Sequence, residues 1–304
     1  MHSSNRNWLV FAGITTLFWG VWGAFIEVPE KNGLPATLGF SVWALTMIIP
    51  AVISLKRINW KINFTRKSVF YGCLIGFTGA GGQLILFTNA LNLGPAYLIF
   101  PIISLSPVIT IFLSMVFLKE RTNKIVWIGI VLAMLSIPLL SYVSPESGVG
   151  SGALWLIFAL IVFAAWGIQA FFMKIANQTM KAEEIFFYMT VTGLIMIPLA
   201  LMMTDFSLPI NYGMDGMYLA AGIQLLNAFG ALTLVFAFRY GKAIIVSPLT
   251  NSAAPLLTVF ISLMIYGHVP NNVVIAGMVL ATLATFLISF GEELKSSKRK
   301  NQAK

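Results

Sequence analysis

The stretch WLVFAGITTLFWGVWGAF, residues 8–25, returns later in the chain as WLIFALIVFAAWGIQAFF, residues 155–172. At one fixed offset the two stretches share eight identities, which in the first copy are Trp8, Leu9, Phe11, Ala12, Ile14, Trp19, Gly20 and Phe25. The same offset carries Gly94, Ala96 and Pro101 onto Gly241, Ala243 and Pro248, and one inserted residue brings Gly129 onto Gly277. Self-similarity at a fixed spacing predicts two copies of one structural unit.

The composition indicates a membrane protein. Hydrophobic residues make up 58% of the chain and charged residues only 10%, whereas soluble domains carry roughly 25% charged residues. The apolar residues come in runs of about 20, which is the length of a helix that crosses a bilayer. The net charge of +9 does not indicate nucleic acid, because the basic residues lie between the apolar runs and at the C-terminus. The single cysteine, Cys73, provides no disulfide or metal framework.

We therefore expect an all-α integral membrane protein with ten transmembrane helices, five in each copy. The apolar runs place these helices at 8–28, 36–55, 68–91, 95–118, 124–143, 152–174, 183–204, 215–238, 243–266 and 272–290. The predicted organisation is a first repeat over 1–143, an external hinge over 144–151, a second repeat over 152–291 and a basic cytoplasmic tail over 292–304.

The distribution of basic residues predicts the orientation. Every Lys and Arg except Lys31 falls in segments on one side of the predicted membrane. Because cytoplasmic loops carry an excess of Lys and Arg, both termini should be cytoplasmic, with the plasma (inner) membrane as the default location. An odd number of spans in each copy makes the second copy inverted relative to the first. Inverted repeats around a midplane site are typical of secondary transporters, which expose that site to each side alternately.

The duplicated unit, the FWG at residues 18–20 and the stretch PAYLIFPIISLSPVITIFLSMVFLKER, residues 95–121, resemble the EamA-like branch of the drug/metabolite transporter superfamily. The resemblance covers nearly the whole chain and implies transport of a metabolite such as an amino acid, a sugar or a nucleotide sugar. Halves of this family usually end their fourth span with an acidic signature. The first copy has Glu120 there, but the second has Tyr266, Gly267 and His268, so a role for a second acidic residue cannot be transferred.

Polar and aromatic side chains near the span centres are the candidates for a substrate site. An unpaired polar group facing lipid costs several kcal/mol, so such groups are expected to face protein or a wet cavity. The predicted substrate-binding residues are Trp19, Trp22, Gln83, Ser104, Trp166, Gln169, Asn227, Asn251 and Ser252. The alternative for the amides is a hydrogen bond between helices, and for the tryptophans it is packing against neighbours.

Prolines fall at corresponding places in the fourth and ninth spans. Proline removes a backbone hydrogen bond inside a helix, which is tolerated where the freed carbonyl faces protein or water. The predicted helix breaks are Pro101, Pro107, Pro248 and Pro255, and they make these two spans the first choice for lining the transport path. Simple kinking for packing is the alternative.

Glu27 and Lys174 occupy equivalent positions at the ends of the first and sixth spans. Glu27 follows an apolar run, and burial there would favour a carboxyl that binds and releases a coupling proton. The alternative is an exposed carboxylate at the external rim. We expect Lys174 to extend its amino group to the cytoplasmic surface.

The leading hypothesis is a secondary transporter that moves a small polar metabolite by alternating access, with proton coupling or exchange left open. No Walker A sequence and no His-Glu-x-x-His or Gly-x-Ser-x-Gly motif is present, so neither an ATP-driven pump nor an enzyme is expected, and no cofactor or metal is implied. The alternatives are a channel or passive facilitator, or a membrane protein with a structural or regulatory role. The expected partners are the substrate and the lipid bilayer, with no nucleic acid, and a homodimer stays open.

Overall fold

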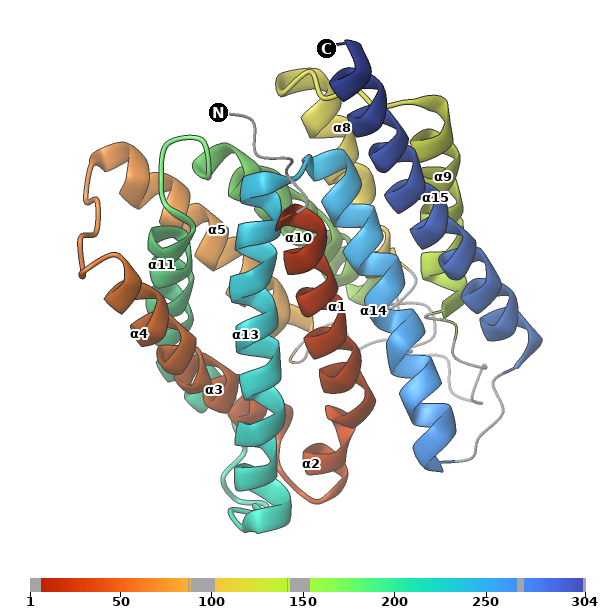
Figure 1. Ribbon diagram of the computed structural model, residues 1–304. Coiled ribbons are helices and arrows are strands. Elements are labelled where there is room, and N and C mark those ends of the chain that lie inside the picture. The colour runs from red at the N-terminus through yellow and green to blue at the C-terminus, as the bar shows by residue number, and fades with distance from the viewer. Residues whose placement is uncertain are drawn as a thin grey trace.

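The computed structural model describes residues 7–86, 88, 102–140, 142, 154–266 and 271–302, and all its regular elements are helices (Figure 1). The first copy contains α1 (Asn7–Phe25), α2 (Glu27–Lys31), α3 (Ala36–Thr46), α4 (Ile48–Arg57), α5 (Arg66–Ile85), α8 (Pro107–Phe117) and α9 (Lys124–Leu140). The second contains α10 (Leu154–Ala176), α11 (Ala182–Ile195), α12 (Ile197–Met202), the π-helix η2 (Met214–Tyr218), α13 (Leu219–Tyr240), α14 (Ala243–Tyr266) and α15 (Asn272–Gln302).

These helices match the ten predicted spans. Within the described residues, six helical segments are long and apolar enough to cross a membrane, namely Asn7–Lys31, Ala36–Arg57, Arg66–Ile85, Leu154–Ala176, Ala182–Met202 and Met214–Tyr240. Four shorter apolar helices fall on the other spans, at Ile102–Phe117, Lys124–Leu140, Ala243–Thr258 and Asn272–Ile288. The prediction of a ten-helix membrane protein in two halves is thus confirmed. The predicted hinge, 144–151, lies outside the described residues.

The contact between α9 and α15, which are equivalent helices of the two copies, shows that the copies are inverted. Near the start of α9, Gly129 packs against Ile288, which lies further along α15 than Gly277 does. Near the start of α15, Gly277 packs against Leu139 near the end of α9. The two helices therefore run antiparallel, as Figure 1 also shows. Small residues at such crossings let helices in a membrane approach closely.

The first helix of each copy packs against the other copy. Helix α1 contacts α13 and α14, and its equivalent α10 contacts α5 and α8. The hydroxyl of Thr258 donates to the carbonyl of Gly20 over 3.0 Å, and the hydroxyl of Thr110 donates to the carbonyl of Gly167 over 3.0 Å. Gly20 and Gly167 are equivalent in the repeat, so the centre of the molecule is built symmetrically from both copies.

The second and seventh spans are each interrupted, which corrects the expectation of one continuous helix. Met47 separates α3 from α4, and Met196 separates α11 from α12. Pro50 and Pro198 follow these interruptions at equivalent places. A proline removes the hydrogen bond to the carbonyl four residues earlier, and its ring crowds that carbonyl. The break is therefore a repeated feature of the five-helix unit.

The predicted breaks at Pro248 and Pro255 are wrong, because α14 runs through both prolines without ending. Each proline removes one backbone hydrogen bond, but the surrounding turn stays helical. The side chains of Thr250 and Asn251 donate to the carbonyls of Val246 and Ser247 over 2.9 Å in each case.

Pro107 does mark a break. Helix α8 begins at Pro107 after a turn at Leu105 and Ser106, with the short helical segment 102–104 before that turn. Pro101 lies outside the described residues. The fourth span is therefore interrupted, whereas the ninth is not.

The two ends of the bundle differ in charge. At one end, Lys242 donates to the carbonyl of Arg121 over 2.8 Å and Arg239 donates to the carbonyl of Met180 over 3.2 Å. The start of α1 and the end of α15 lie towards this end (Figure 1), which we call the basic end. The opposite end, which we call the acidic end, carries the α2 residues Glu27, Glu30 and Lys31, with Asp215 of η2 close by.

Candidate functional site

A cavity of about 740 Å³ lies between the two copies, with walls from α1, α3, α5, α10, α13 and α14. Eight of the nine predicted substrate-binding residues line it, namely Trp19, Trp22, Gln83, Ser104, Trp166, Gln169, Asn227 and Asn251. Ser252 does not. It is fully buried, and its hydroxyl donates to the carbonyl of Leu249 over 3.1 Å. The structure therefore brings the predicted residues to one cavity, while their contact with a substrate stays a prediction.

Two equivalent tryptophans occupy mirrored positions in the cavity wall. Trp19 Nε1 donates to the carbonyl of Asn227 over 3.3 Å, and Trp166 Nε1 donates to the carbonyl of Gly79 over 3.4 Å. Each indole lies against a glycine of the other copy, Gly230 for Trp19 and Gly82 for Trp166. A Cβ atom on either glycine would collide with the indole, so glycine is needed for this close approach.

The indole N–H of Trp22 is also hydrogen-bonded within the protein. A fourth tryptophan of the cavity, Trp43, was not predicted. Trp22 Nε1 donates to Gln224 Oε1 over 3.0 Å, so the indoles of α1 and α10 turn ring surfaces rather than free N–H groups towards the cavity. Trp43 of α3 also lines the cavity. Sequence reasoning missed it because an aromatic residue in a membrane span is most often a packing residue.

Carboxamides, together with the unpaired indole N–H of Trp43, are the polar side-chain groups of the described lining that stand out as free of partners. Within the described part of the chain, the side chains of Gln83, Gln169 and Asn227 have no hydrogen-bond partner, although Asn227 is only 9% exposed. By contrast, the hydroxyls of Thr250 and Thr258 are already bonded to backbone carbonyls. A carboxamide supplies both donors and an acceptor without carrying charge. The cavity therefore offers neutral hydrogen-bonding groups between aromatic surfaces.

The cavity reaches the surface at the acidic end. Glu27, Glu30 and Lys31 belong to its lining. Glu27 and Lys31 form an ion pair of 2.7 Å, and their side chains are 70% and 73% exposed. A carboxylate that is this well hydrated lacks the burial that a proton carrier would need. The geometry favours the rim alternative for Glu27 over the coupling-proton role.

Lys174 joins two helices at the opposite end of the bundle. At the end of α10 its amino group donates to the carbonyl of Phe238 over 3.0 Å and also to the carbonyl of Gly241. The side chain of Lys174 is partly exposed at this end, and its amino group binds carbonyls at a helix end, a contact that the sequence did not predict. Because the last carbonyls of a helix lack backbone partners and carry partial negative charge, they bind a cation well. This contact joins α10 to the end of α13 at the basic end.

Glu120 makes a second connection there. Its Oε2 accepts from the backbone N–H of Ile244 over 3.1 Å, in the first turn of α14. Burial raises the pKa of the Glu120 carboxyl above its usual value, opposed by the amide of Ile244 and by the positive charges of Lys174 and Lys242. Glu120 thus binds the N-terminus of the ninth span, where unpaired N–H groups favour an acceptor.

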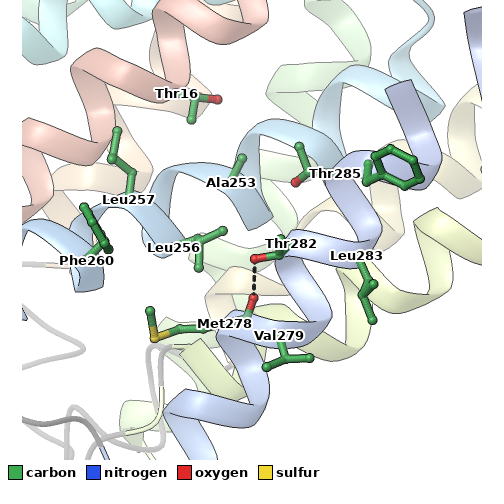
Figure 2. Close-up of a pocket in the computed structure, with 11 residues that line it drawn as sticks. Thr16, Ala253, Leu256, Leu257, Phe260, Met278, Val279, Thr282, Leu283 and Thr285 are labelled. Atoms are coloured by element: carbon green, nitrogen blue, oxygen red, sulfur yellow. Dashed lines mark hydrogen bonds between the residues drawn. The ribbon is translucent and has the colours of Figure 1, made fainter. Parts of the chain in front are cut away.

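A second hollow lies on the outside of the bundle and has a different character. It has a volume of about 820 Å³ and is lined by α14 and α15, with Thr16 of α1 at its edge (Figure 2). The hydroxyl of Thr282 donates to the carbonyl of Met278 in its own helix over 2.8 Å, as the dashed line shows. Phe286 is 62% exposed. This apolar groove belongs to the outer surface and offers little to a polar substrate.

Comparison with known proteins gives a consistent result. The model of the EamA-like transporter family matches residues 6–142 and 153–290. An uncharacterised protein of Methanocaldococcus jannaschii is 30% identical over 134 residues, which are 44% of this chain and 95% of the relative. An uncharacterised transporter of Archaeoglobus fulgidus is 31% identical over 143 residues, 45% of this chain and 48% of the relative.

A pseudopaline exporter of Pseudomonas aeruginosa is 28% identical over 186 residues, which are 61% of this chain and 63% of the relative. The matches to the Archaeoglobus and Pseudomonas proteins therefore span only part of those relatives. A crystal structure superposes with a TM-score of 0.77 at 13% identity, covering 94% of this chain and 97% of the other. That likeness supports the fold over nearly the whole length.

Proposed function

This chain belongs to the EamA-like transporter family, and from that premise we propose that it carries a small polar metabolite through the central cavity by alternating access. Membership makes the protein a membrane transporter of small molecules rather than an enzyme. The proposal concerns the route, the mechanism and the residues. Its substrate contacts are the eight predicted residues that line the cavity.

The main support for the proposal is that the two ends of the cavity differ in their access to the surface. The cavity reaches the surface at Glu27 and Lys31, whereas α10 is bonded to α13 through Lys174 at the other end. A carrier needs one binding site with a single open side at a time. Because the copies are inverted, the movement that opens the basic end has an equivalent that closes the acidic end.

The proposed orientation places both termini and the basic end in the cytoplasm, as the distribution of Lys and Arg predicts. The described conformation is then open to the outside. We propose the plasma membrane as its location and export as its direction, which the name of the Pseudomonas relative supports. Cysteines added at each terminus, in a Cys73→Ser background, test the orientation. An impermeant thiol reagent applied to intact cells should leave both unlabelled, and labelling of both would reverse the topology.

The test of transport is counterflow in proteoliposomes that contain the purified protein. A pool of labelled amino acids, sugars and nucleosides is offered with and without a pH gradient. Saturable uptake that is accelerated by unlabelled substrate inside the vesicles is expected of a carrier. Flux that does not saturate and shows no counterflow would instead indicate a channel or passive facilitator.

A matched pair of variants links the flux to the cavity. Gln83→Leu changes a carboxamide in the cavity that has no hydrogen-bond partner within the described residues, so it should reduce counterflow at least ten-fold without loss of folded protein. Gln178→Leu is the same substitution at an exposed position after α10, and it should leave counterflow unchanged. Equal effects of the two variants would remove the cavity from the proposed route.

A further inference from the structure

We propose that the central cavity excludes anions, and that its substrate is a neutral, zwitterionic or cationic molecule with a flat or aliphatic face. The proposal rests on the transport function proposed above and narrows its substrate class. It follows from which charges the cavity has, where they lie, and which polar groups are left free for a ligand.

The deep part of the cavity has no positive charge to meet an anion. Among the described residues that line it, the charged ones are Glu27, Glu30 and Lys31, all at the acidic end. Lys174 is not part of the lining, and its amino group is bonded to the carbonyls of Phe238 and Gly241. The internal segments outside the described residues contain no Lys or Arg in their sequence. A carboxylate or phosphate group without a partner would therefore be costly to desolvate there.

The entrance adds a negative field. Two carboxylates and one ammonium group line the mouth, and the ammonium of Lys31 is paired with Glu27. The carboxylate of Glu30 remains in excess at this opening. Clefts lined by one sign of charge raise the local concentration of ligands with the opposite charge. A cation is thus favoured at the mouth, and an anion is repelled before it reaches the carboxamides.

The remaining groups define what the cavity does bind. Gln83, Gln169 and Asn227 present neutral donors and acceptors. The N–H groups of Trp19, Trp22 and Trp166 are already used within the protein, so these indoles offer ring surfaces that suit flat, aliphatic or cationic groups. The volume of about 740 Å³ lies in the range of about 300–1,000 Å³ that is typical of pockets for small molecules.

The first test measures the charge preference of the cavity without needing its substrate. A single cysteine is placed in the lining as Ala170→Cys in a Cys73→Ser background. Its rates of modification by a trimethylammonium methanethiosulfonate and by a sulfonate methanethiosulfonate are measured in detergent and divided by the rates for free cysteine. We expect the normalised rate of the cation to exceed that of the anion at least ten-fold.

Two controls show whether the preference comes from the acidic mouth. Glu27→Gln combined with Glu30→Gln should reduce the ratio several-fold at the same cysteine. An exposed cysteine at the basic end, Gln178→Cys, should show no preference for the cation. Equal rates of the two reagents at Ala170→Cys, a faster anion or no reaction with either reagent would each overturn the proposal.

The second test uses a charge series on one indole ring. Tryptophanamide, tryptophan and N-acetyltryptophan carry net charges of about +1, 0 and −1 at neutral pH. They compete against whichever labelled substrate shows counterflow, alongside adenosine and adenosine 5′-monophosphate. We expect the anionic member of each set to compete at least ten-fold more weakly than its neutral or cationic counterparts.

The two tests separate the two proposals. Equal competition by the anions would overturn the charge assignment and leave the carrier function standing. A cation preference at Ala170→Cys with no flux for any compound would support the charge assignment and overturn the carrier function.

Discussion

The two copies are alike in the middle of the molecule and unlike at their ends. In the middle, Trp19 and Trp166 each donate to a backbone carbonyl of the other copy and lie against equivalent glycines. At the ends, Glu27, which follows α1, corresponds in the repeat to Lys174 in the last turn of α10. The shared part surrounds the cavity. The differing part comprises the end where Glu27 lines the cavity and the end where Lys174 joins α10 to α13.

This difference has an electrostatic reason. The amino group of Lys174 binds carbonyls at the C-terminus of α13, where the helix dipole is negative and attracts a cation. Glu27 in the equivalent place would be repelled by such a terminus, and in the structure it pairs with Lys31. If the two copies were identical, the conformation closed at the basic end and the conformation closed at the acidic end would be equally stable. The unequal charges instead favour the conformation that is closed at the basic end.

The largest effect is expected from Lys174→Met, which keeps the aliphatic part of the side chain and removes its charge. Two hydrogen bonds from a charged donor are lost, each worth about 1.5–3 kcal/mol. The basic end should open more often, and counterflow should fall at least ten-fold. Spin labels on Gln178→Cys and Arg121→Cys in a Cys73→Ser background would show longer distances across this end.

Lys124→Met is the matched control, because Lys124 is an exposed lysine at the same end. It should leave both the distances and the counterflow unchanged. Distances in the Lys174→Met variant that equal those of the unmodified protein would show that other contacts close the basic end.

A smaller effect, dependent on pH, is expected from Glu120. Burial raises the pKa of its carboxyl in the closed state above the ordinary value of 4.5, to which it returns when the end opens and hydrates. The closed state therefore binds the proton more tightly. Acidification favours closure, and raising the pH through the elevated pKa favours opening. The spin-label distances across the basic end should lengthen as the pH rises through this window.

Glu120→Gln is the control for this titration, since the amide can still accept from the N–H of Ile244 but binds no proton. The distances in this variant should not change with pH over the same window. Lys174 and Lys242 face the carboxyl, so a pH response that persists in Glu120→Gln would assign the titration to another group.

The likeness of the two copies is tested by Trp19→Phe and Trp166→Phe. Each variant loses one N–H···O bond, worth about 1 kcal/mol, and keeps an aromatic ring against its glycine. Thermal unfolding should show equal destabilisation for both, with no change for the exposed Trp60→Phe. Destabilisation of one variant alone would show that the middle of the molecule is less symmetric than its contacts indicate.

The smallest effect is expected from Glu27→Gln. An exposed ion pair contributes about 0.2–1 kcal/mol, so transport of a neutral substrate should stay within about two-fold of the unmodified protein. Its pH profile should keep its shape. A flattened profile would instead restore Glu27 as the group that carries a coupling proton.

The fold was predictable because hydropathy and the repeat both act over many residues. Apolar runs separated by basic loops locate the ten spans, and the shared Trp19 and Trp166 reveal the duplication. The helix breaks were harder to predict. Pro50 and Pro198 are single residues within apolar runs and interrupt their helices, whereas Pro248 and Pro255 do not. The outcome depends on the neighbouring turns, which composition does not describe.

The cavity was predictable only in part. Polar residues at membrane depth are few, so choosing Gln83, Gln169 and Asn227 needed no three-dimensional information. Trp43 escaped notice because an aromatic residue in a membrane span is most often a packing residue. The contact of Lys174 with α13 depends on which helix ends lie side by side. This arrangement could not be predicted from hydropathy or from the repeat.

The contact between α9 and α15 has a consequence for how the chain holds together. A helix that pairs with its own counterpart in antiparallel fashion, through Gly129 and Gly277, makes the protein resemble a dimer of half-length subunits joined into one polypeptide. The Methanocaldococcus relative is about as long as one such half, since 134 matched residues are 95% of it. The peptide connection between the halves then serves mainly to fix their ratio at one to one, while the surfaces that recognise each other are already encoded within each half.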